Sequence, residues 1–305
     1  MNTNKFKVTG EKKIELKDYQ SKIKAPAAER VTAQLAGNLG AISALQDKLY
    51  ADRKEGLIII IQGMDASGKD GIVRHVMSGV NPQGVNVYSF KQPSQQDLMH
   101  DYLWRITPCI PERGKIAIFN RSYYEDVLIV KVRELYKKFN MPKRCNQEEV
   151  VEKRYEQIVN FEQYLWDNGI RVVKIFLHLS KDEQKKRLLE RIDDEAKNWK
   201  FSKSDIEERA FFEDYQDAYE KAINATASKR APWYIIPADK KPVARLAVSE
   251  IVMQTLIDMK PSYPDLPLEI KECLQDCKSL LLAEDEQTED KEKKNEDKEK
   301  KNNED

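Results

Sequence analysis

The residues whose types most clearly suggest chemistry form a glycine-rich turn, Gly63-Met64-Asp65-Ala66-Ser67-Gly68-Lys69-Asp70. Its Gly-x4-Gly-Lys spacing is that of a phosphate-binding loop. Glycines let the backbone turn tightly and direct successive N–H groups at an anion, and Lys69 adds a mobile charge for terminal phosphates. A chance glycine turn is the alternative. We expect phosphate to be contacted by Lys69 and by the loop residues Gly63, Met64, Ala66, Ser67, Gly68 and Asp70.

Two acidic residues make this loop unusual. Asp70 follows Lys69, where a Ser or Thr hydroxyl usually contacts magnesium. Asp65 lies inside the loop, where a carboxylate would repel phosphate unless it held a metal or oriented an attacking phosphate oxygen. Because carboxylate oxygens suit Mg²⁺, we predict Mg²⁺ as the cofactor, with Asp65 as a ligand.

A second candidate site segment is Asn120-Arg121-Ser122-Tyr123-Tyr124-Glu125, at the expected end of another strand. The strand end beside a phosphate loop faces the phosphates. Arg121 could clamp phosphate oxygens in a bidentate fashion. Asn120 and Glu125 are candidate nucleotide or Mg²⁺ ligands. The alternative is that Asn120 caps a helix and Glu125 is an acid in its first turn.

Further cations lie outside these two segments. The stretch from Lys185 to Arg209 is rich in Lys and Arg and includes the candidate phosphate ligands Arg187 and Arg191. By itself such a stretch is most often a solvated helix face. In a nucleotide kinase it would be a mobile lid that closes over the transferring phosphate. Lys91 and Arg105 are expected on the acceptor side, near the phosphates or base of a nucleotide.

The hydrophobic pattern indicates the elements that position these residues. The aliphatic run Leu57 to Ile61 suits a strand covered on both faces. Further strands are expected at 85–90, 115–119, 171–179 and 233–236. Helices are expected at 27–53, 95–106, 123–139, 148–168, 180–192 and 243–259. This alternation predicts an α/β fold, a P-loop kinase-like doubly wound parallel sheet with helices on both faces and a helical lid.

Composition suggests how the chain is organised. We expect an N-terminal arm at 1–27, a kinase domain at 28–260 with its lid at about 182–212, a C-terminal extension at 261–283 and a charged, disordered tail at 284–305. The 52 basic and 52 acidic residues balance, which argues against a general nucleic-acid coat protein. No stretch has the length and apolarity of a membrane span, and the start of the chain does not resemble a signal peptide. We expect a cytoplasmic protein with no nucleic-acid or membrane partner.

Several motifs together resemble the second family of polyphosphate kinases. They are the turn at 63–71, Lys91-Gln92-Pro93-Ser94, His100-Asp101-Tyr102-Leu103-Trp104-Arg105, the segment Phe119 to Asp126, Trp199-Lys200-Phe201-Ser202, Ala231-Pro232-Trp233 and Ile236-Pro237-Ala238-Asp239. The resemblance covers about residues 5 to 260. Many members of that family carry Asp at the position of Asn120. Asn120 with Glu125 is similar to the subgroup that accepts both AMP and ADP.

The resemblance implies reversible, Mg²⁺-dependent phosphoryl transfer between inorganic polyphosphate and purine nucleotides. It makes Asp65 a metal or phosphate-orienting residue, Lys69 and Arg121 phosphate ligands, and Arg191 a lid arginine. It also implies a homo-oligomer, a dimer or a tetramer. Two alternatives stay open, an ATP-dependent nucleoside-monophosphate kinase and a non-catalytic nucleotide- or polyanion-binding module.

Overall fold

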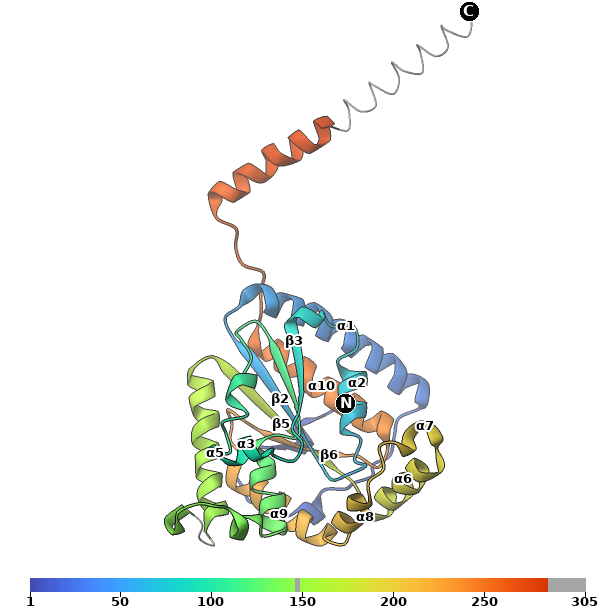
Figure 1. The fold of residues 1–305 in the computed structure, drawn as a ribbon. Coiled ribbons are helices and arrows are strands. Elements are labelled where there is room, and N and C mark those ends of the chain that lie inside the picture. The colour runs from blue at the N-terminus through green and yellow to red at the C-terminus, as the bar shows by residue number, and fades with distance from the viewer. Residues whose placement is uncertain (146–148, 285–305) are drawn as a thin grey trace, which may run out of the picture. The chain divides into compact units, whose positions relative to one another are not determined.

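The computed structural model describes residues 1–145 and 149–284, and the chain divides into two units, 1–262 and 263 onward. A six-stranded sheet organises the first unit (Figure 1). Its spatial order is β1-β6-β5-β2-β4-β3, and every neighbouring pair is parallel except β1 with β6. The strands are β1 (Lys7–Val8), β2 (Gly56–Gln62), β3 (Val85–Ser89), β4 (Ile116–Asn120), β5 (Ile170–His178) and β6 (Trp233–Pro237).

Strand β2 is central because its side chains supply two hydrophobic cores. Successive residues of a strand point to opposite faces. Ile58 and Ile60 accordingly join one buried cluster, and Ile59 and Ile61 join the other. Burial on both faces explains the uninterrupted aliphatic run.

Long helices cover both faces of the sheet (Figure 1). The core that contains Ile59 also receives side chains from α1 (Ala28–Asp52), α2 (Lys69–Val76) and α10 (Lys241–Met259). The opposite core receives side chains from α5 (Val150–Asp167) and α9 (Phe212–Thr226). The predicted α/β fold class is confirmed.

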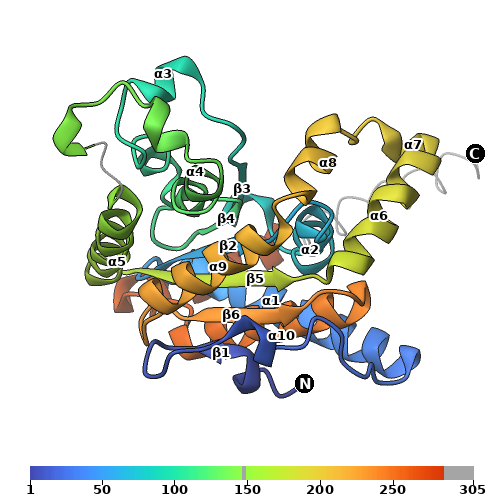
Figure 2. The ribbon, with the colours of Figure 1, turned by 90° about the horizontal axis from the view of Figure 1, so that it is seen from below.

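Three helices form the expected lid region, which stands to one side of α2 in Figure 2. They are α6 (Lys181–Asp193), α7 (Glu195–Asn198) and α8 (Lys203–Arg209). Ser180, Asp194 and Ser202 cap their N-termini, each accepting a backbone N–H on its side-chain oxygen. The lid is therefore built from short helices with well-defined starts.

The N-terminal segment contributes to the sheet, which its polar composition did not indicate. Lys7 and Val8 pair with Tyr234 and Trp233 in the antiparallel sense. Phe6, Val8 and Leu16 are buried, and these few apolar side chains attach the segment to the two cores.

Two of the expected long helices are wrong. The segment 95–106 contains only α3 (Gln95–Leu98), and the Asp101 side chain then accepts the Leu103 N–H and favours a turn. The segment 123–139 breaks into a 3-10 turn (Tyr123–Asp126), α4 (Ile129–Val132) and a second 3-10 turn (Leu135–Lys138). The Arg154 guanidinium donates a hydrogen bond to the Asp126 carbonyl, and Glu134 has a left-handed backbone with φ 45°. A local side-chain turn therefore interrupts the helix expected in the first segment, whereas a tertiary contact outweighs helical propensity in the second.

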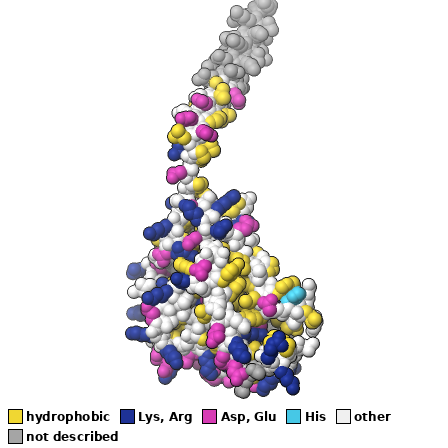
Figure 3. Space-filling view, turned by 90° about the vertical axis from the view of Figure 1, so that its left-hand side faces the viewer, with side chains coloured by type: hydrophobic (Ala, Val, Ile, Leu, Met, Phe, Trp, Pro, Cys, Tyr) yellow, Lys and Arg dark blue, Asp and Glu magenta, His cyan; other side chains and the backbone are white. Residues whose placement is uncertain are grey.

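The second unit is described from Tyr263 to residue 284 and contains a helix over 268–284. Its exposed apolar side chains include Leu268, Leu274 and Leu281. Figure 3 shows hydrophobic side chains of this unit in yellow. The tail predicted at 284–305 lies, after residue 284, outside the described residues. None of the helices in the described part of the chain is long and apolar enough to cross a bilayer.

Candidate active site

The glycine turn connects β2 to α2. Gly63 and Gly68 have φ values of 152° and 102°, which disfavour any side chain. A Cβ on Gly63 would lie 2.7 Å from the Ser67 hydroxyl oxygen. Helix α2 begins at Lys69, so its positive N-terminal end adds to the N–H groups of the loop.

Lys69 is buried and is held by the loop itself. Its ammonium donates to the carbonyl oxygens of Gly63 at 2.7 Å and Met64 at 3.1 Å. Burial and the nearby Arg121 lower its pKa to about 8, although the carboxylates of Asp65, Glu125 and Asp70 oppose the shift. A bound anion would stabilise the charged form of Lys69 and raise this pKa.

Arg121 joins the loop to the end of β4. Its guanidinium donates to Asp65 at 2.6 Å and to Glu125 at 3.0 Å. Glu125 and Asp65 raise the pKa of Arg121 even though burial opposes them. Arg121 also has a left-handed backbone, with φ 64°. The structure thus brings together three of the residues predicted from two separate segments.

Asn120 and Asp70 meet on the other side of the loop. The Asn120 amide donates to Asp70 at 2.8 Å, and Lys200 of the lid lies 3.0 Å from the second Asp70 oxygen. Burial alone would raise the pKa of Asp70, but the hydrogen bonds from Lys200 and Asn120 outweigh it and lower the pKa. Asp70 therefore contacts the lid, a role that the sequence did not reveal.

The two candidate lid arginines have different surroundings. Arg191 pairs with Asp205 at 2.7 Å and lines the main cavity of the site. Arg187 is 5% exposed, and its guanidinium donates to Glu183 and to four backbone carbonyls, those of Ala66, Ser67, Ala238 and Asp239. Because its N–H groups are directed at protein acceptors, Arg187 holds the loop against the base of the lid.

Lys91 and Arg105 also differ in placement. Lys91 lines the cavity. The Arg105 guanidinium donates to the Lys91 carbonyl at 2.8 Å and lies over the Phe90 ring, 5.8 Å from its centroid. Arg105 is absent from the cavity lining and supports the segment that carries Lys91.

The cavity over the phosphate loop has a volume of about 760 Å³. Its lining includes more cations than anions. The basic residues are Lys69, Lys91, Arg121, Arg187, Arg191, Lys197, Lys200, Lys241 and Arg245, and the acidic ones are Asp65, Asp70, Glu190 and Asp205. An excess of positive charge in a concave surface concentrates polyanions there. Glu125 lies in a small adjoining cavity that Asp65 and Asp205 also line.

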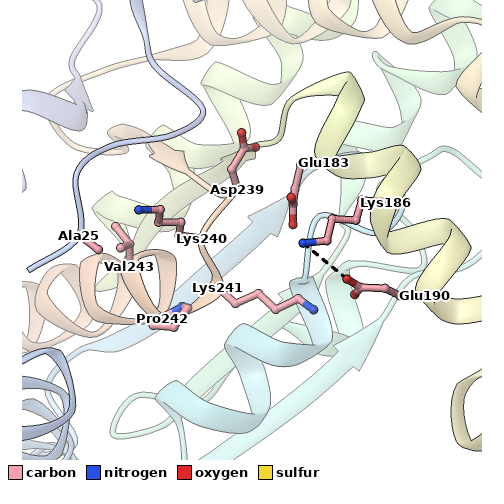
Figure 4. Close-up of a pocket in the computed structure, with 9 residues that line it drawn as sticks. All are labelled: Ala25, Glu183, Lys186, Glu190, Asp239, Lys240, Lys241, Pro242 and Val243. Carbon is pink, nitrogen blue, oxygen red and sulfur yellow. Dashed lines mark ion pairs between the residues drawn. The ribbon is translucent and has the colours of Figure 1, made fainter. Parts of the chain in front are cut away.

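Lys241 and Arg245, at the start of α10, are cavity residues that the sequence analysis missed. Their four-residue spacing places them on one helix face, which is the only signal that the sequence offered. Lys241 also lines a neighbouring cavity of about 310 Å³ with Lys240 and Lys186 (Figure 4). In that cavity Lys186 lies 3.9 Å from Glu190.

The residues present fit a magnesium ion that substrate phosphates help to hold. No group of three or more His, Cys, Asp or Glu side chains in the described residues is arranged as a metal site. Mg²⁺ usually takes only one or two carboxylates and completes its shell with water and phosphate oxygens. The Asp65 carboxylate lines the same cavity as the phosphate loop, which is the placement that such a site needs.

Comparisons with known proteins show the family of the chain. Residues 24–264 match the family model of polyphosphate kinase 2. The chain is 48% identical over 284 residues to an ADP-polyphosphate phosphotransferase of Rhodopseudomonas palustris, covering 92% of this chain and 98% of the relative. It is 46% identical over 223 residues to an AMP/ADP-polyphosphate phosphotransferase of Meiothermus ruber, covering 73% and 80%.

A solved structure extends the likeness to three dimensions. The crystal structure of polyphosphate kinase 2 from Arthrobacter aurescens superposes with a TM-score of 0.80 at 36% identity, covering 89% of this chain and 95% of that one. The resemblance noted in the sequence is confirmed. The chain belongs to the polyphosphate kinase 2 family.

Proposed function

We propose that this protein transfers a phosphoryl group, reversibly, between inorganic polyphosphate and the nucleotides AMP and ADP. The observation that carries the proposal is the cationic cavity directly over the phosphate loop, with Lys69, Arg121 and Arg191 on its walls. Such a cavity suits a continuous chain of phosphates. The relatives named above act on ADP, or on AMP and ADP, with polyphosphate.

In the proposed reaction an oxygen of the nucleotide's terminal phosphate attacks the terminal phosphorus of polyphosphate. A new P–O bond forms, the anhydride bond to the rest of the chain breaks, and a chain one phosphate shorter leaves. Lys69, Arg121 and Arg191 neutralise the charge that develops on the transferred group. Catalysis of this kind is positioning and charge neutralisation, so no covalent intermediate with the protein is required.

Asp65 has two roles in this proposal. Its carboxylate orients the Arg121 guanidinium, to which it is bonded at 2.6 Å. It is also the protein ligand for Mg²⁺, with Asn120 and Glu125 as further candidates through water. When bound, Mg²⁺ would be held by Asp65 and would neutralise charge on the phosphates. Lys91 would contact the nucleotide phosphates.

Three further features belong to the proposal. Asn120 followed by Glu125 supports acceptance of both AMP and ADP, because this pair is similar to the subgroup that uses both. We also propose a homo-oligomer, a dimer or a tetramer. The cytoplasmic location expected from the sequence stays a prediction.

A donor-swap assay tests the function. The purified protein is incubated with Mg²⁺ and AMP, ADP, GMP or GDP, with either polyphosphate or ATP as donor. We expect transfer from polyphosphate to AMP and ADP. Transfer to AMP from ATP but not from polyphosphate would instead identify a nucleoside-monophosphate kinase. Binding of polyphosphate without any turnover would identify a non-catalytic module.

A further inference from the structure

A buried ion pair contacts the turn Tyr123–Asp126, which closely follows Arg121. Glu162 of α5 and Lys174 of β5 are 2.5 Å apart, and their side chains are 3% and 0% exposed. The hydroxyl groups of Tyr123 and Tyr124 each lie 2.9 Å from the other oxygen of the Glu162 carboxylate. Both tyrosines are fully buried. The carboxylate is thus shared between one cation and two phenols.

Two more elements close this network. The Lys174 ammonium also donates to the Thr226 carbonyl at 2.8 Å, at the end of α9. The Thr226 hydroxyl oxygen accepts from the Trp233 indole of β6 at 2.9 Å and lies 2.9 Å from the Tyr124 hydroxyl. Burial lowers the pKa of Lys174, and Glu162 opposes that shift. Helices α5 and α9 and strands β5 and β6 therefore meet at one set of polar contacts.

A buried ion pair adds little to the free energy of unfolding, so stability alone does not account for it. Removing two charges from water is costly, and well-packed apolar residues of similar volume often stabilise a core as well or better. A buried hydrogen-bonded network does fix the orientation of the groups that it contacts. The groups contacted here are the side chains of two consecutive residues, Tyr123 and Tyr124.

Those residues belong to the active-site turn. Tyr123 and Tyr124 begin the four-residue 3-10 turn Tyr123–Asp126, which also carries Glu125. Glu125 pairs with Arg121, and Arg121 pairs with Asp65 of the phosphate loop. A non-glycine residue in the left-handed region, such as Arg121 with φ 64°, needs its surroundings to hold it there.

We propose that Glu162 and Lys174 are positioning residues. Through Tyr123 and Tyr124 they hold the turn from Arg121 to Glu125 in the geometry that phosphoryl transfer needs. The importance of that geometry for catalysis rests on the proposed function, whereas the holding of the turn does not.

Removal of single hydroxyl groups tests the proposal with little change in packing. Tyr124→Phe and the double variant Tyr123→Phe/Tyr124→Phe should lower kcat by about 10- to 100-fold, because small misplacements of catalytic groups have effects of that size. The KM for ADP should change by less than about threefold if ground-state binding is retained. Rates are measured well below the Tm of every variant, so that all molecules are folded.

Tyr155→Phe is the matched control. Tyr155 is also a buried tyrosine, of α5, but its hydroxyl has no hydrogen-bond partner in the described part of the chain. The kcat of the Tyr155→Phe variant should equal that of the wild type. If Tyr124→Phe and the double variant behave like Tyr155→Phe, the proposal is overturned.

Amide hydrogen exchange gives a readout that does not depend on the reaction. In the double variant, exchange should become faster in a peptide spanning 121–126 while β2 keeps its protection. Unchanged exchange in that peptide would overturn the proposal even if activity fell. A wild type that lacks transfer from polyphosphate would contradict the proposed function instead, and the exchange result would still decide whether the network holds the turn.

The variant Glu162→Gln/Lys174→Met removes both charges without leaving either one unpaired. We expect it to fold and to show the same local increase in exchange and the same loss of kcat. Full wild-type kcat in this folded variant would show that the ion pair does not position the turn.

Discussion

Arg121 is the residue at which the two halves of the site meet. Its guanidinium bonds to Asp65 of the phosphate loop and to Glu125 of its own turn, so one cation fixes two carboxylates. This arrangement balances the charge of an acidic residue inside the glycine turn. Because Arg121 neutralises Asp65, the Asp65 carboxylate would repel an anion in the turn less strongly.

At the residue scale we predict that Asp65→Asn lowers kcat by about 100-fold or more, within the range found for charged catalytic groups. The Asn side chain has nearly the same shape as that of Asp65 but lacks the negative charge that orients Arg121 and would attract Mg²⁺. Steady-state rates with polyphosphate and ADP test this. Asp217→Asn is the control, since Asp217 pairs with Lys221 on the exposed surface of α9. Near-normal turnover of Asp65→Asn would contradict the assigned role.

The lowered pKa of Lys69 predicts a pH dependence. Lys69 carries its charge below a pH of about 8 and loses it above that value in the free enzyme. Because the charged form binds phosphate, kcat/KM for polyphosphate should be level below pH 8 and fall about tenfold per pH unit well above it. A profile that is flat to pH 10 would show that the Lys69 pKa is not lowered.

At the scale of elements, helix α6 connects the glycine turn to the rest of the lid, α7 and α8. Arg187 at its middle bonds to loop carbonyls, whereas the segment after it reaches Asp70 through Lys200. Lys200 and Asp70 are exposed to 40% and 65%. An ion pair this exposed contributes at most about 1 kcal/mol. The base of the lid is therefore anchored, and its outer part is held only weakly.

We predict that Lys200→Gln raises the KM for polyphosphate several-fold and leaves the Tm unchanged within about 1 °C, because the exposed ion pair adds little stability. Lys200 lines the cavity, so its loss removes a cation that faces the substrate. Lys203→Gln serves as the control, because Lys203 is also exposed on the lid but is not among the cavity residues. Equal KM values for the two variants would rule out a specific role for Lys200.

At the scale of the whole molecule, charge is unevenly distributed. The chain has 52 basic and 52 acidic residues, yet the main cavity has nine basic and four acidic side chains. Folding thus gathers cations from segments as distant as Lys69 and Arg245. All the residues that line this cavity belong to the first unit, 1–262.

We predict that a protein ending at residue 262 keeps the activity of the full chain, with kcat/KM within about a factor of two, because a unit with its own core can fold alone. The match to the family model ends at residue 264, close to the same boundary. Side-by-side kinetics and thermal unfolding of the two proteins test this. A large loss of activity in a truncated protein that is still folded would assign a catalytic role to the C-terminal unit.

The sequence by itself determined the parallel strands β2 to β6 and the glycine turn, but not the antiparallel edge strand β1. Strands such as β2 can be predicted from the sequence because burial on both faces requires an unbroken run of aliphatic residues. The turn can be predicted because two of its positions, Gly63 and Gly68, have φ values of 152° and 102°, which glycine adopts far more readily than other residues. Asn120 and Arg121 could be predicted because the end of a strand beside a phosphate loop faces the phosphates. The pairing of β4 with β2, which only the structure shows, brings the two segments together.

The tertiary structure alone decided how the polar side chains pair. Asp70 with Lys200, Arg187 with the loop carbonyls, and Glu162 with Lys174 join residues far apart in the chain. No local pattern encodes such partners, because each depends on the packing of whole elements. The same reason explains one of the two wrong helices, the one expected at 123–139, whereas a local turn at Asp101 interrupts the other. In the segment 123–139, helical periodicity lost to buried contacts that attach Tyr123 and Tyr124 to Glu162.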